Sequence, residues 1–139
     1  MNTFKYLYYY FFYKLCKLYE NSFYTTLADF RALISVITLK ICFLFSIINY
    51  AEVFTKKNII NSNPYHITNI IIFALFILMD IYMLVVKSEW KLYFKEFDKL
   101  PNIKNRNGCI AVAVIILFIF MNLIYSFYLM SQIDWQRYN

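Results

Sequence analysis

The feature that most constrains this chain is an uninterrupted apolar run, CIAVAVIILFIFMNLIYSFYLM at residues 109–130, which contains no charged side chain. About 20 apolar residues in a helix cross the hydrocarbon core of a bilayer. Two further runs have similar length, at residues 33–53 and 67–86, and each carries few charges. We therefore predict an all-α integral membrane fold, in which three transmembrane helices form a single membrane domain over residues 1–139.

The composition supports a lipid environment. Of the 139 residues, 62% are hydrophobic and 16% are charged, which is too much apolar surface for one small water-soluble core. One glycine and two prolines favour long helices with few turns. The formal charge of +6 is concentrated beside the apolar runs, where it meets anionic headgroups, so we attribute it to membrane topology and predict no nucleic-acid partner.

The distribution of Lys and Arg predicts the orientation, because cytoplasmic loops of membrane proteins carry more of them than translocated loops. Ten lie before the first run or between the second and third, and three lie in the remaining segments. We therefore predict a multi-pass protein of the cell inner (plasma) membrane, with a cytoplasmic N-terminus and an outside C-terminus. The ten are Lys5, Lys14, Lys17, Arg31, Lys87, Lys91, Lys95, Lys99, Lys104 and Arg106; the three are Lys56, Lys57 and Arg137.

Residues 4–20 predict an amphipathic helix rather than a fourth span, because lysines interrupt the aromatic run. With 100° per residue, Phe and Leu gather on one face, while most tyrosines gather on the other together with Lys14 and Lys17. We predict that this helix lies in the interface and that the two lysines contact lipid headgroups. The alternative is a helix packed on the protein's own spans.

The second run is predicted to continue as one amphipathic helix to about residue 100. Trp90, Tyr93, Phe94 and Phe97 follow it with a spacing of i, i+3, i+4 and i+7. Proline disfavours a helical conformation in the residue before it, so this helix is predicted to end before Pro101. Residues 101–108 are predicted to form a flexible hinge.

Two ionisable residues, Lys40 and Asp80, fall inside predicted spans, where an unpaired charge costs several kcal/mol. They lie seven and six residues from the inner ends of their runs, so we predict an intramembrane ion pair that fixes the register of the first two spans. Two alternatives remain: Lys40 extends to the interface while Asp80 is tolerated, or Asp80 acts as a proton or cation relay.

Asn49, Asn69 and Asn122 also lie in the spans, and we predict interhelical polar contacts for them, with an aqueous path as the alternative. The cysteines, Cys16, Cys42 and Cys109, have no metal-ligand spacing, so reduced structural thiols are expected; acylation of Cys16 or Cys109 is the alternative.

The chain offers no plausible set of residues for catalysis. Its one histidine, His66, is predicted to be a boundary residue, and there is no Gly-rich phosphate loop or Ser/His pattern. We predict no catalytic residues, no cofactor and no metal. The segment FFYKLCKLY at residues 11–19, placed before three or four spans, resembles small inner-membrane proteins of AT-rich bacteria, and the layout is similar to that of toxin or bacteriocin immunity proteins.

That resemblance implies a non-enzymatic protein that binds a membrane partner, either as an immunity protein or as an accessory subunit. The alternative is a homo-oligomeric pore or membrane-disrupting effector, in which symmetry brings the polar residues of the spans together. A third hypothesis is a structural or lipid-organising role.

Overall fold

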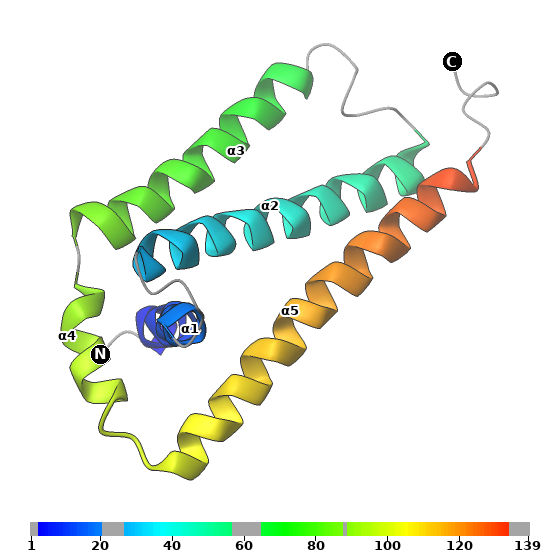
Figure 1. The fold of residues 1–139 in the computed structure, drawn as a ribbon. Coiled ribbons are helices and arrows are strands. Elements are labelled where there is room, and N and C mark those ends of the chain that lie inside the picture. Colours follow the sequence, from blue (N-terminus) through cyan, green and yellow to red (C-terminus); the bar gives the residue numbers. More distant parts are fainter. Residues whose placement is uncertain (1–2, 21–26, 57–64, 88, 134–139) are drawn as a thin grey trace.

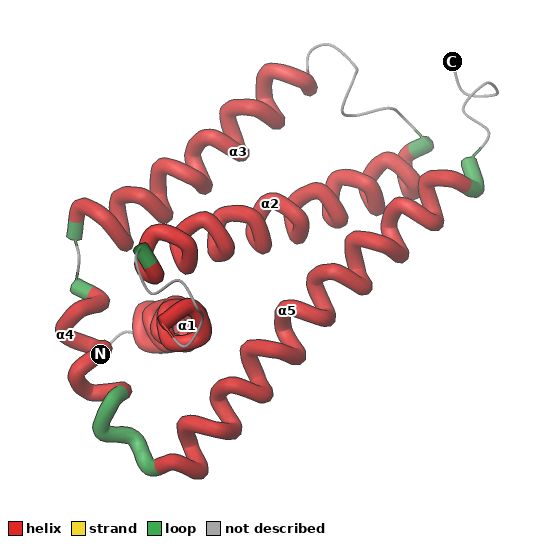
Figure 2. Tube along the Cα trace, in the orientation of Figure 1, coloured by secondary structure: helices red, strands yellow, loops and turns green. Residues whose placement is uncertain are grey.

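The computed structural model describes residues 3–20, 27–56, 65–87 and 89–133. Every element in this part of the chain is helical, as Figure 2 shows, so the predicted all-α fold is confirmed. Three helical segments are long and apolar enough to cross a membrane, at Ala28–Thr55, Ile67–Val86 and Asn102–Ser131. The elements are α1 (Thr3–Glu20), α2 (Ala28–Thr55), α3 (Tyr65–Ile81), a π-helix η1 (Tyr82–Val86), α4 (Trp90–Phe97) and α5 (Asn102–Ser131).

The long helices α2 and α5 form a V (Figure 1). They approach each other toward their C-terminal ends and diverge toward their N-terminal ends, where α1 fills the gap and lies across both of them. Helix α4 flanks α1, and α3 lies on the other side of α2 and diverges from it. The N-terminal ends of α2 and α5 and the C-terminal end of α3 thus lie with α1 and α4 at one end of the molecule.

The helix ends of α2 follow from local chemistry. Its first turn contains Asp29, whose charge is favourable at the positive end of the helix dipole. It ends at Thr55, after which Lys56 adopts a left-handed conformation with φ 54°, a common way to terminate a helix. At 28 residues the helix is about 42 Å long, longer than the hydrocarbon core, because it extends beyond the predicted run at its N-terminal end.

The continuous helix predicted from residue 67 to about 100 is wrong. The chain changes to a π-helical turn at Tyr82–Val86, where the Lys87 amide donates to the Tyr82 carbonyl at 3.0 Å, and α4 begins as a separate helix at Trp90. The indole Nε1 of Trp90 donates to the Leu84 carbonyl at 2.6 Å. Helix α4 then runs in a different direction from α3 (Figure 1), and its aromatic face packs against α1.

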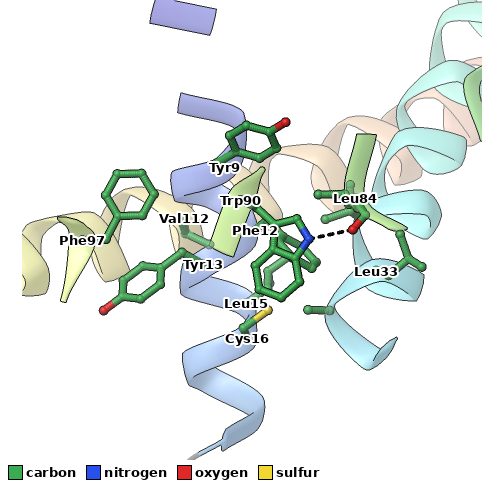
Figure 3. Packing of buried hydrophobic residues seen from close by; sticks show 12 residues of the cluster. Tyr9, Phe12, Tyr13, Leu15, Cys16, Leu33, Leu84, Trp90, Phe97 and Val112 are labelled. Carbon is green, nitrogen blue, oxygen red and sulfur yellow. Dashed lines mark hydrogen bonds between the residues drawn. The ribbon is translucent and has the colours of Figure 1, made fainter. Parts of the chain in front are cut away.

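The main hydrophobic core (Figure 3) contains residues of α1, α2, η1, α4 and α5, and its aromatic part lies between α1 and α4. Phe12 packs edge-on against Trp90 with ring centroids 5.3 Å apart, and Tyr13 packs against Phe94 at 4.9 Å. Phe97 is fully buried among α1 rings. The i, i+3, i+4, i+7 aromatic pattern therefore marks a packing face that has its partner within the chain. The aromatic residues that α1 and α4 bring into contact are Tyr6, Tyr9, Tyr10, Phe12, Tyr13, Trp90, Tyr93, Phe94 and Phe97.

The middle of α1 is buried on both of its predicted faces. Tyr9 and Tyr13 from the predicted polar face are at most 2% exposed, and Phe12 and Leu15 from the predicted apolar face are 2% and 4% exposed. The physical reason is that α1 packs against α4 as well as against α2 and α5, so no side of its middle turns faces lipid or water. The contacts of α1 thus follow the alternative interpretation, a helix packed on the protein's own helices.

The hinge predicted at residues 101–108 is also wrong beyond its first residue. Pro101 precedes α5, and the Asn105 amide donates to the Pro101 carbonyl at 3.0 Å, so the helix is already formed at Asn102. Gly108 is buried inside α5 because Tyr10 crosses it closely: a Cβ there would lie 1.9 Å from the Tyr10 hydroxyl. The glycine makes room for the Tyr10 side chain rather than for a bend.

Candidate functional site

The two charged residues of the predicted spans lie together. Lys40 of α2 and Asp80 of α3 form a hydrogen-bonded ion pair through Nζ and Oδ1. The Asp80 side chain is 2% exposed, while that of Lys40 is 30% exposed. This is the contact that the sequence predicted, and it joins α3 to the rest of the molecule.

A third residue completes this group. The Tyr8 hydroxyl of α1 donates to the same Asp80 oxygen at 2.7 Å, and the Lys40 ammonium lies 4.7 Å from the centre of the Tyr8 ring. The buried carboxylate therefore accepts two hydrogen bonds, one of them from a cation, which offsets its loss of hydration. Three helices, α1, α2 and α3, meet at this polar group, which we call the Asp80 triad: Tyr8, Lys40 and Asp80.

The predicted asparagine contacts lie near the narrow end of the V. Asn49 of α2 donates through Nδ2 to the Ser126 hydroxyl of α5 at 3.0 Å. Tyr50 donates to the Asn122 side-chain oxygen at 2.8 Å. Both bonds join α2 to α5, so Asn49 and Asn122 make interhelical contacts, although not with each other. Asn69 is half-buried in α3, on the other side of α2.

The two lysines predicted to face headgroups have different environments. Lys14 is 5% exposed and donates to the Asn105 carbonyl at 2.9 Å, between the rings of Tyr10 and Tyr13. One donor of its ammonium is thus used inside the protein, and its contact with a lipid headgroup stays a prediction. Lys17 is 40% exposed, and its hydrogen bond with Glu20 raises its pKa, so it remains charged.

Near these lysines, Tyr13 and Lys17 of α1 make polar contacts with Asp98, in the segment that precedes α5. Burial raises the pKa of Tyr13, so its phenol stays protonated and donates to Asp98 at 2.7 Å. Lys17 lies 3.5 Å from the same carboxylate. A cleft of about 490 Å³ opens here, which we call the basic cleft, lined by Tyr13, Lys14, Lys17, Asp98, Asn102, Asn105, Arg106 and Cys109.

A second cleft, of about 480 Å³, lies beside the Asp80 triad between α1, α2, α3 and α5. Its lining is almost wholly apolar, and Lys40 is its one charged residue. We call it the apolar cleft; the residues that line it are Tyr8, Phe11, Val36, Leu39, Lys40, Phe43, Leu44, Ile47, Phe76, Ile115 and Ile119.

The cysteines differ in accessibility. Cys16 is fully buried in the core, and burial raises the pKa of its thiol, so the structure gives an acylating enzyme no access to it. Cys109 is exposed at the start of the apolar part of α5. Acylation of Cys109 stays a prediction. The side chain of His66 lies outside the described residues.

Sequence reasoning missed Tyr8, Tyr50 and Ser126 as members of these contacts. Tyr50 adjoins Asn49, and Ser126 follows Asn122 by one helical turn, so polar neighbours at helical spacing were the available signal. Tyr8 gave no such signal, because it lies among aromatic residues in a run where tyrosine is common.

No family model, curated protein or solved structure matches this chain. Its function is therefore inferred from the arrangement of its own residues.

Proposed function

We propose that this chain is a non-enzymatic integral membrane protein that binds the transmembrane segment of a protein partner through α3 and the apolar cleft. The observation that carries this proposal is the apolar cleft of about 480 Å³ beside the exposed helix α3. Large apolar side chains project from several sides of α3, including Ile67, Leu75 and Leu78, each about 60% exposed. In its most apolar 18-residue window, 11% of Ile67–Val86 is buried, the same share as in Asn102–Ser131 and less than the 28% in Ala28–Thr55.

The way α3 is held supports the same proposal. Asp80 joins its C-terminal end to α1 and α2, and the rings of Phe45 and Phe73 lie 5.5 Å apart nearer its middle. Toward its N-terminal end it diverges from α2 (Figure 1). A helix fixed at one end beside an open apolar cleft offers a second helix two surfaces at once. Helices associate in lipid through such van der Waals packing and polar contacts.

The proposed setting is a bilayer, with α1, α4 and the start of α5 at the cytoplasmic end. Ten of the 14 basic residues belong to the segments at this end, which is the asymmetry expected for an inner-membrane protein with its N-terminus inside. The C-terminus would then lie outside. The lengths of α2 and α5, about 42 and 45 Å, exceed the hydrocarbon core of about 30 Å, so their ends reach the headgroup region.

Within this proposal, immunity to a membrane-active toxin and an accessory role in a larger complex are two forms of the same activity, namely recognition of a foreign helix. The homo-oligomeric pore remains the alternative. It requires polar residues that are free to line a channel, whereas Asn49 and Asn122 are used in contacts with Ser126 and Tyr50 inside one chain.

Photocrosslinking in the native host tests the proposal. A photoreactive phenylalanine analogue replaces Leu75 or Leu78 on α3, and Met121, an exposed apolar residue of α5, is the matched control. We expect discrete adducts with another polypeptide from the α3 positions and none from Met121. Adducts with lipid alone from all three positions would contradict a protein partner, and a covalent homodimer would favour the pore. Membrane potential, measured with a dye on induction, should remain unchanged unless the chain forms pores.

A further inference from the structure

We propose that the basic cleft binds the phosphate of an anionic phospholipid from the cytoplasmic leaflet, with one acyl chain extending along α5 into a smaller apolar cleft. This inference rests on the proposed membrane insertion of the chain. It names a ligand and a site that a protein partner for α3 does not require.

The charge of the basic cleft favours an anion. Three cationic side chains, Lys14, Lys17 and Arg106, line it together with one carboxylate, that of Asp98. Lys17 already pairs with Glu20 at 3.0 Å and lies 3.5 Å from Asp98, and Lys14 donates to a backbone carbonyl. Arg106 makes no ion pair with any residue in the part of the chain that the structure describes, so its guanidinium is available to a phosphate, which it can bind through two parallel hydrogen bonds.

The start of α5 supplies further hydrogen-bond donors to the lining. Its first turn begins in the cleft at Asn102, and no side chain caps this helix end, so backbone N–H groups and the positive end of a 30-residue helix face the same region. The cleft thus combines an excess of positive charge with unmet backbone donors.

The residues of α5 connect the basic cleft to an apolar one. Asn102, Asn105 and Cys109 share one stripe of the helix, and Ile116 and Phe120 lie on the same stripe two and three turns farther along. Ile116 and Phe120 line a cleft of about 290 Å³, which we call the chain cleft. Along α5, polar residues that suit a phosphate are therefore followed by apolar residues that suit an acyl chain. The headgroup and acyl chain of a lipid follow each other in the same order from the membrane surface inward.

Helix α1 shows the same division. Lys14 and Lys17 line the basic cleft, while the residues that directly follow each of them, Leu15 and Leu18, line the chain cleft. The lysines therefore face the headgroup side and the leucines face the hydrocarbon side. A helix that lies across the spans in this way is positioned at the boundary between headgroups and acyl chains (Figure 1).

Lipid exchange on the full-length protein tests this site. The protein is placed in nanodiscs of phosphatidylcholine that contain a small fraction of phosphatidylglycerol, and the lipid retained on extraction into detergent is quantified by native mass spectrometry. We expect enrichment of phosphatidylglycerol, and a loss of about tenfold in its affinity for Arg106→Gln, as for removal of one charged bidentate contact. Lys95→Gln is the matched control, because it removes one positive charge from an exposed site on α4, at the same end of the molecule as the basic cleft.

The acyl part has its own variant. Ile116→Trp should fill the chain cleft and reduce retention of phosphatidylglycerol, while leaving competition by free glycerol phosphate unchanged. Circular dichroism and thermal melting identify any variant that fails to fold, and Ile116→Phe then replaces Ile116→Trp. Equal retention of phosphatidylglycerol and phosphatidylcholine, an equal loss for Lys95→Gln and Arg106→Gln, or displacement of the lipid by inorganic phosphate with no effect of Ile116→Trp would each overturn the proposal. Resistance of the wild-type chain to alkaline extraction separates failure of this site from failure of membrane insertion.

Discussion

Removal of Lys40 should destabilise the protein mainly because it leaves the Asp80 carboxylate without its cation. The Asp80 side chain is 2% exposed, and after Lys40→Met it keeps only the Tyr8 hydrogen bond at 2.7 Å. Breaking a buried ion pair costs about 3–5 kcal/mol. The Lys40 side chain is 30% exposed, so part of its charge is solvated and the lower end applies, about 3 kcal/mol.

The double variant Lys40→Met/Asp80→Leu removes both charges and should cost only about 1 kcal/mol, because a buried pair replaced by apolar residues is often nearly neutral. The costs of Lys40→Met and Asp80→Leu therefore should not add: with about 0–2 kcal/mol for Asp80→Leu alone, the coupling free energy should be about 2–4 kcal/mol. Unfolding by SDS in mixed micelles, followed by tryptophan fluorescence, measures the four free energies of the cycle. A coupling below about 0.5 kcal/mol would refute the role of the pair. A charge swap, Lys40→Asp/Asp80→Lys, should recover part of the loss of the single swaps.

Three further outcomes are expected. Gly108→Ala should destabilise the chain by about 1–3 kcal/mol, because its Cβ overlaps the Tyr10 hydroxyl, and a second change, Tyr10→Ala, should relieve part of this loss in the same SDS unfolding assay. Asn49→Leu should cost on the order of 1 kcal/mol through loss of its bond to Ser126, and Ser126→Ala should then add almost nothing further; additive losses would contradict the contact. In the folded protein a small maleimide should label Cys109 and leave the buried Cys16 of α1 unlabelled until SDS is added. Peptide mass spectrometry measures the labelling of each cysteine, and equal rates would contradict the burial of α1.

The three long apolar helices were predictable from the composition of the sequence. A run of about 20 apolar residues specifies a helix whatever surrounds it, because every backbone polar group must be satisfied within the helix in a lipid environment. The Lys40–Asp80 contact followed from the same logic, since two isolated charges at similar depth have few other partners.

The packing of α1 was not predictable from its own periodicity. Its hydrophobic pattern gives no preference between a lipid surface and a protein surface, and tyrosine suits both. The outcome depends on α4, whose aromatic residues Trp90 and Phe94 contact Phe12 and Tyr13 only because the chain breaks after Val86. That break arises from tertiary packing, and no proline or glycine in residues 82–90 marks it.

The start of α5 was misjudged for a related reason. Asparagine, lysine and glycine in residues 101–108 are typical of a loop. In the structure, however, Gly108 makes room for the Tyr10 side chain, and Lys14 donates to the Asn105 carbonyl. Local propensity is a weak preference that such contacts override. The basic cleft depends on the same segment being helical, so it could not be located from the sequence.

The central claim is that three helices cross a bilayer with α1 and α4 at the cytoplasmic end, and a topology measurement tests it most directly. Single cysteines are introduced at Lys95 in α4 and at the C-terminus of a variant in which all three native cysteines are replaced by serine or alanine. A membrane-impermeant maleimide is then applied to intact cells. The C-terminal cysteine should be labelled at once and the cysteine at position 95 only after the membrane is permeabilised. Labelling of position 95 in intact cells, or protection of the C-terminus, would contradict the proposed arrangement.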